Sequence, residues 1–207
     1  FNVFVYNSNR IKNEKIDKFL ESPEEVEAFI NVKLKAYREF IDRLNPGLYQ
    51  SKEDYSWVKN CKKKNVAFLG LNSAWACEGD GDPLHIALGF PQVIAALDRT
   101  EGIANKILLL HHPLFNCFEL RDFNKWSGEI FDKCRLILHG HVHFDNTLAL
   151  NTPSASCISI GANAVYTHDG YIGFQFIRVC FEKDGTMVRV WPYKLETREQ
   201  IAFLPDT

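Results

Sequence analysis

Two apolar stretches of this sequence end in histidines. Residues 136–143 read LILHGHVH, and residues 108–113 read LLLHHP. Positions two apart in an extended segment face the same side, so His141 and His143 can present two imidazoles together. Neutral imidazole is a common ligand of divalent transition metals. This pair therefore indicates a site for one metal ion or for two adjacent ions.

The other histidines of the two stretches need a separate interpretation. A single histidine at a strand end is more often capped or solvated than bound to a metal. We expect His139 only to precede the turn, and Gly140 to let the backbone turn or approach closely. His111 and His112 end a different apolar run, and their combination with the GHVH pair favours a metal site.

Apolar strands and helices alternate around these histidines. VAFLGLN at 66–72, KILLLHHP at 106–113 and RLILHGH at 135–141 have the apolar character of strands covered on both faces. Helical patterns at 89–99 and 129–134 separate them, and this order predicts a parallel α/β layer. Ligands of such sheets bind beyond the carboxyl ends of the strands. The side chains predicted to meet on that rim are Asn72, His111, His112, His141 and His143.

The sequence predicts a single domain, residues 1–207, with three parts that differ in composition and predicted secondary structure. These are a charged, helical part at 11–60, an α/β part at 64–143 and a mostly antiparallel β part at 147–207. In the first part, a helix is predicted to begin at Pro23 and to stop at the NPG of residues 45–47. In the last part, the KDG of residues 183–185 predicts a β-hairpin.

Composition excludes several classes of protein. With 207 residues, 46% of them apolar, the chain can bury one sizeable core. A formal net charge of −2 gives no basic footprint that would indicate nucleic acid. No apolar run reaches the roughly 20 residues that span a bilayer, so no membrane association is expected. The six cysteines are widely spaced without a CxxC pair, which predicts free thiols and a cytoplasmic location.

The order of these motifs resembles that of the calcineurin-like metallophosphoesterases. LLLHHP and GHVH look like the last two motifs of that family. LGLNSAWAC at 69–77 resembles the strand that precedes them in a bacterial branch. The resemblance covers residues 64–193 and implies an α/β sandwich of two mixed β-sheets flanked by helices. It also implies hydrolysis of a phosphomonoester or phosphodiester at a two-metal site.

The family's ligand pattern carries over to three histidines of this chain. The resemblance implies that His111 and His141 share one metal ion and that His143 binds its neighbour. His112 and Asn72 would then support the ligands or face the phosphate-ester substrate, and no catalytic residue is assigned. Mixed ligands of this kind suit Mn, Fe or Zn.

The earlier motifs of the family are absent. D-x-H, G-D-x-x-D and G-N-H-D/E would supply the acidic ligands, a metal-binding asparagine and the catalytic histidine, but residues 1–65 contain no D-x-H. GDGDP at 79–83 falls too late along the chain, and NSNR at 7–10 stands where G-N-H-D would be expected. We therefore expect a chain that lacks the first strands of the fold and the acidic half of the site.

Three functions stay open at this stage. The chain can be the C-terminal portion of a metallophosphoesterase, a catalytically inactive relative used for binding, or a mononuclear metal protein built on His111, His141 and His143. Without its first strands, a parallel sheet would have an open edge that needs covering. We expect either the helix at 23–44 or self-association with a second copy of the chain to cover it.

Overall fold

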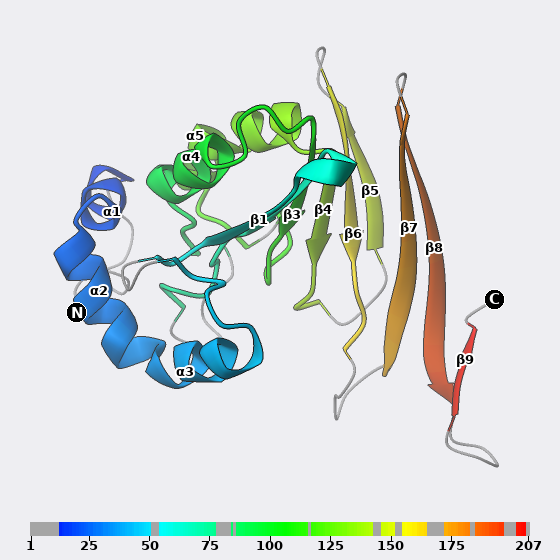
Figure 1. The fold of residues 1–207 in the computed structure, drawn as a ribbon, viewed down its shortest axis with the longest axis horizontal. Helices are drawn as coiled ribbons and strands as arrows, with labels where there is room; N and C mark the ends of the chain where they lie inside the picture. Colours follow the sequence, from blue (N-terminus) through cyan, green and yellow to red (C-terminus); the bar gives the residue numbers. More distant parts are fainter. Residues whose placement is uncertain are drawn as a thin grey trace.

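The computed structural model of the protein arranges most of the chain in layers (Figure 1). A helical layer, a six-stranded sheet and a three-stranded sheet follow one another. The α/β class and the presence of two sheets with helices beside them agree with the prediction from the sequence, but the smaller sheet is antiparallel and not mixed as predicted. The residues described are 13–50, 54–77, 84, 86–115, 117–142, 146–151, 155–164, 172–182, 185–196 and 202–205.

The larger sheet carries the predicted site. Its strand order is β1-β2-β3-β4-β6-β5. The strands are β1 (Trp57–Cys61), β2 (Val66–Gly70), β3 (Asn105–Leu109), β4 (Leu136–His139), β5 (Asn146–Asn151) and β6 (Ser156–Gly161). The strands β2, β3, β4 and β6 are parallel, whereas β1 and β5 run antiparallel at the two edges. The predicted parallel arrangement of β2, β3 and β4 is confirmed.

Helices α4 (Phe90–Asp98) and α5 (Leu120–Lys133) cover one face of this sheet (Figure 1). Trp126 and Ile130 of α5 pack with Leu69, Leu108 and Ile137 of the strands in one core cluster. Each of these side chains is at most 1% exposed. Burying an aliphatic side chain of this size contributes about 1.5–3 kcal/mol, so the cluster holds the helices on the strands.

The second sheet covers the opposite face. It contains β7 (Gly173–Glu182), β8 (Gly185–Glu196) and β9 (Ala202–Pro205) in the order β7-β8-β9, all antiparallel. Ile177 and Val190 pack against Ile107, Leu136 and Ile160 of the larger sheet. Because both faces are covered, β3 and β4 read as continuous apolar runs in the sequence.

The strands after residue 146 divide between the two sheets. The sequence predicted one mostly antiparallel region there, but β6 pairs with β4 in parallel and so extends the larger sheet. The hairpin of β7 and β8 is confirmed by their continuous antiparallel pairing. Lys183 and Asp184 of its predicted turn lie outside the described residues.

The helical part contains α1 (Asn13–Leu20), α2 (Pro23–Lys33) and α3 (Lys35–Leu44). The helix predicted to begin at Pro23 does so, but it is divided in two at Leu34, where the backbone has φ −110° and ψ 9°. Phe19 stacks on Trp75 with ring centroids 5.7 Å apart. This contact joins α1 to the loop after β2, and the adjacent ion pair of Asp17 with Lys125 joins α1 to α5.

The edge of the parallel strands is covered by β1, which the sequence did not predict. Trp57 pairs with Gly70 across the two strands. A Cβ built on Gly70 would lie only 2.1 Å from Cε2 of the Trp57 ring, so glycine makes room for this indole. Strand β1 therefore takes the place at the β2 edge that was expected for the helix at 23–44 or for a second copy.

Among the described residues, none of the helices has the length and apolar character needed to cross a membrane. None of the six cysteines, all of which are among the described residues, forms a disulfide. Burial raises the pKa of Cys134 and of Cys157 to about 12. These two thiols therefore stay protonated at neutral pH and serve as packing groups.

Candidate metal centre

The histidines of HHP and GHVH come together because β3 and β4 are neighbours. Leu109 pairs with Leu138 in the parallel register. The ladder continues past the strand ends, where the Gly140 N–H donates to the His111 carbonyl over 3.1 Å. The two motifs are thus joined by a backbone hydrogen bond at the carboxyl end of the sheet, where ligands of α/β proteins bind.

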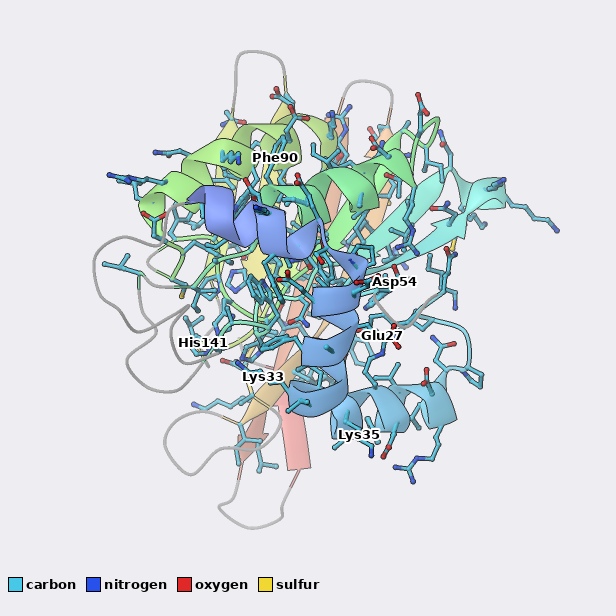
Figure 2. The ribbon with its side chains drawn as sticks, turned by 90° about the vertical axis from the view of Figure 1, so that its left-hand side faces the viewer. Glu27, Lys33, Lys35, Asp54, Phe90 and His141 are labelled. Atoms are coloured by element: carbon cyan, nitrogen blue, oxygen red, sulfur yellow. The ribbon has the colours of Figure 1, made fainter. Side chains whose placement is uncertain are left out.

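Three imidazoles form the cluster, which we call the histidine cluster: His111, His112 and His141. One ring nitrogen of each lies within 4.8 Å of those of the other two. The ring centroids are 4.7 Å apart for His111 and His112, 5.2 Å for His111 and His141, and 4.6 Å for His112 and His141. His111 and His141 are exposed, whereas His112 is only 5% exposed. Figure 2 shows His141 below α1 and to the left of α2.

The histidine cluster can bind a metal ion. Ligand bonds of 2.0–2.1 Å in a tetrahedral site separate imidazole nitrogens by about 3.3 Å, so binding a metal would draw these nitrogens, now within 4.8 Å of one another, closer together. Imidazole donors suit Zn, Fe and other transition metals. No carboxylate of the described residues belongs to the group.

The backbone at His141 has an uncommon conformation. Its φ is +70°, and the Val142 N–H donates to the Gly140 carbonyl over 2.9 Å, which makes a three-residue turn centred on His141. A side chain at positive φ costs about 1–2 kcal/mol. Gly140, which was expected to provide the freedom for this turn, has a φ outside the left-handed region. The turn thus holds the imidazole of His141 toward β3 at some cost in stability, a pattern common at functional sites.

His112 is held by two residues that the sequence interpretation missed. Its Nδ1 lies 3.0 Å from the hydroxyl of Ser73, and its backbone N–H donates to the same oxygen over 3.3 Å. Its Nε2 lies 3.9 Å from the sulfur of Cys77. Ser73 is 1% exposed and Cys77 is half-buried. Both lie in LGLNSAWAC, one and five positions after Asn72, so the only signal was their position beyond the carboxyl end of β2.

Asn72 orders the loop that carries Ser73. Its side-chain oxygen accepts a hydrogen bond of 3.0 Å from the Ala74 N–H. Its own backbone N–H and carbonyl are bonded to the side chain of Gln92, over 2.5 and 3.2 Å. Gln92 is fully buried in α4. Asn72 thus connects the start of α4 with the loop under His112.

His139, the first histidine of LILHGHVH, is not part of the histidine cluster. His139 ends β4, is 6% exposed, and has its Nδ1 3.2 Å from the Gly140 carbonyl. Burial lowers the pKa of this imidazole. His139 therefore precedes the turn and packs, as expected. His143 lies outside the described residues, so its predicted role as a ligand stays a prediction.

No protein-family model matches the chain, and no curated protein matches it significantly. The features of the chain that indicate a function are therefore the histidine cluster and the strands that position it.

Proposed function

We propose that this protein is a metal-dependent phosphoesterase that hydrolyses phosphomonoesters or phosphodiesters. The observation that carries the proposal is the convergence of His111, His112 and His141 at the carboxyl ends of two adjacent parallel strands. The resemblance of HHP and GHVH to the last motifs of the calcineurin-like metallophosphoesterases supplies the reaction class. In this proposal His111 and His141 hold one metal ion, and His143 binds a second one.

The exposure of the ligands fits this reaction. His111 and His141 are both exposed, so a phosphate ester can reach the face of the centre that they line. A bound divalent metal supplies Lewis acidity toward the phosphate oxygens and lowers the pKa of a bound water. The turn at His141, with its positive φ, fixes the backbone that carries this ring before any ligand arrives, which reduces the ordering that binding requires.

The proposal is tested by metal binding and hydrolysis measured on the same preparation. We expect the chain to retain Mn, Fe or Zn after dialysis, as measured by elemental analysis. We also expect it to hydrolyse p-nitrophenyl phosphate or bis-p-nitrophenyl phosphate only in the metal-loaded form. His141→Ala should abolish both properties. His139→Gln, at the end of the same strand but outside the histidine cluster, is the matched control and should keep both.

A mononuclear metal-binding protein without this activity is the second candidate. It is favoured by the absence of any carboxylate from the histidine cluster among the described residues, because two divalent ions held by neutral imidazoles would repel each other. One retained metal ion per chain without hydrolysis of either ester would select this candidate. A chain that retains no metal would instead leave only a binding module.

A further inference from the structure

We infer that Ser73 fixes His112 in the neutral tautomer that carries its proton on Nε2. His112 then acts in the histidine cluster as a hydrogen-bond donor to a phosphate oxygen, and His111 and His141 hold the metal. The inference deepens the proposed function and rests on it for the nature of the bound anion. The tautomer itself follows from the contacts of one buried hydroxyl.

The Ser73 hydroxyl contacts His112 twice. The backbone N–H of His112, 3.3 Å from Ser73 Oγ, can only donate, so the oxygen accepts there. The second contact, 3.0 Å to Nδ1, has either group as donor. Within the described part of the chain, the hydroxyl hydrogen has no acceptor other than this Nδ1. Because Ser73 is 1% exposed, bulk solvent does not reach that hydrogen, and a buried hydroxyl that donates nothing is destabilising. The hydroxyl therefore donates to Nδ1, which must be unprotonated.

The contacts of Cys77 agree with this assignment. When Nδ1 accepts a hydrogen bond, the proton of a neutral imidazole is on Nε2. The His112 Nε2–H then points to the Cys77 sulfur at 3.9 Å, and the thiol in turn donates to the Ser73 carbonyl over 3.5 Å. Each donor of Ser73, His112 and Cys77 in these contacts thus has an acceptor.

This tautomer separates the three histidines by role. An N–H nitrogen has no lone pair for a metal, and the other nitrogen of His112 already accepts from Ser73. The His112 ring still lies 4.6 Å from that of His141, close enough for its N–H to reach an anion held beside the metal. A thiol sulfur is a weak acceptor, whereas a phosphate oxygen forms a charge-assisted bond. A phosphate oxygen can therefore replace the Cys77 sulfur as the acceptor of the hydrogen bond from Nε2–H.

The tautomer is measurable without any variant or metal. Long-range ¹H–¹⁵N correlation spectra of histidine-labelled protein at about pH 8 report which ring nitrogen carries the proton. We expect His112 to show a protonated Nε2, and Ser73→Ala to weaken or lose this preference while the chain stays folded. A proton on Nδ1 in the unsubstituted chain would overturn the inference, whatever the metal results.

Metal and phosphate binding test the roles separately. His111→Ala and His141→Ala should each lower zinc affinity by at least about 100-fold, whereas His112→Gln should lower it by no more than about tenfold. With zinc bound, His112→Gln keeps an N–H donor and should bind inorganic phosphate, while His112→Leu should bind it about tenfold more weakly.

Two results contradict the assigned role of His112. Loss of zinc affinity in His112→Gln as large as in His141→Ala would make His112 a ligand. Equal phosphate affinity in His112→Leu and the unsubstituted chain would remove its role as a donor. If the unsubstituted chain binds none of Zn, Mn and Fe, the proposed function fails, but the spectra of the metal-free protein still decide the tautomer.

Discussion

Two polar clusters lie at the ends of strands and helices in this protein, and they differ in the hydrogen-bond partners of their side chains. In the first, Asp122 of α5 is 1% exposed, and its carboxylate accepts from the Leu88 N–H at 2.7 Å, the Gly89 N–H at 3.2 Å and the Trp126 indole N–H at 2.8 Å. In the second, the histidine cluster, three imidazoles meet and no described carboxylate joins them. The Asp122 cluster joins one acceptor to its three donors, whereas the histidine cluster contains three imidazoles and no described carboxylate.

This difference separates a structural cluster from a functional one. A buried carboxylate with three donors needs nothing from outside, and it fixes the start of α4 against α5. Imidazoles in contact gain nothing comparable from one another, yet the turn at His141 holds its ring toward β3 at positive φ. We therefore expect the first cluster to determine the stability of the fold and the second to respond to metal.

The largest effect is expected for Asp122→Ala. The change leaves three buried N–H groups without an acceptor, so the free energy of unfolding should fall by about 3–5 kcal/mol in urea denaturation. Asp98→Ala, at an exposed position of α4, is the control and should change it by less than about 0.5 kcal/mol. A similarly small loss in Asp122→Ala would mean that the cluster does not support the fold as argued.

Metal removal should lower the stability of the chain only when the histidine cluster is intact. At a free zinc concentration of about 100 times Kd, binding stabilises the native state by about 2.7 kcal/mol, which a chelator should remove. Thermal unfolding with and without the chelator should show this shift in the unsubstituted chain and in Asp98→Ala. His141→Ala should unfold at the same temperature in both conditions. A persistent shift in His141→Ala would place the metal elsewhere in the chain.

The strands that carry the histidine cluster could be predicted from the sequence, whereas the contacts that hold His112 and the edge strand depend on tertiary packing. Apolar runs that end in histidines were enough to predict β3, β4 and the meeting of His111 with His141, because parallel neighbours align their carboxyl ends. The Ser73 contact joins residues 39 positions apart, and no local pattern indicates which histidine a loop serine will reach. Strand β1 was missed for a related reason, since Trp57 is placed by its packing on Gly70.

The pH dependence of stability should carry the sign of a buried carboxylate. Burial raises the pKa of Asp122 above its ordinary value of 3.8, against the opposing effect of its three N–H donors. As pH rises above 3.8, the unfolded chain loses this proton first, so the folded state binds more protons and stability falls. The unfolding free energy of the unsubstituted chain minus that of Asp122→Asn should therefore decrease from pH 3 upward and then level off. An increase of this difference over that range would mean that folding lowers the pKa of Asp122 and does not raise it.

The backbone turn predicts a smaller difference between two substitutions of the same residue. Glycine adopts positive φ without the steric cost that alanine has there. His141→Gly should therefore be more stable than His141→Ala by about 1 kcal/mol in urea denaturation of the metal-free chain. Both should lack metal binding. If His141→Ala were the more stable of the two, the turn would not hold the φ of +70° in solution.

The smallest effect is expected at Gly140, although it lies between two strand-end histidines. A Cβ on Gly140 would come no closer than 3.9 Å to Nδ1 and the carbonyl oxygen of His111, which is ordinary contact. Gly140→Ala should therefore change the unfolding free energy by less than about 0.5 kcal/mol and leave zinc affinity intact. Gly70→Ala is the matched substitution, because its Cβ would overlap the Trp57 ring, and it should cost about 1–3 kcal/mol. Zinc affinity lost in Gly140→Ala alone would show that the glycine, and not the turn at His141, sets the geometry of the histidine cluster.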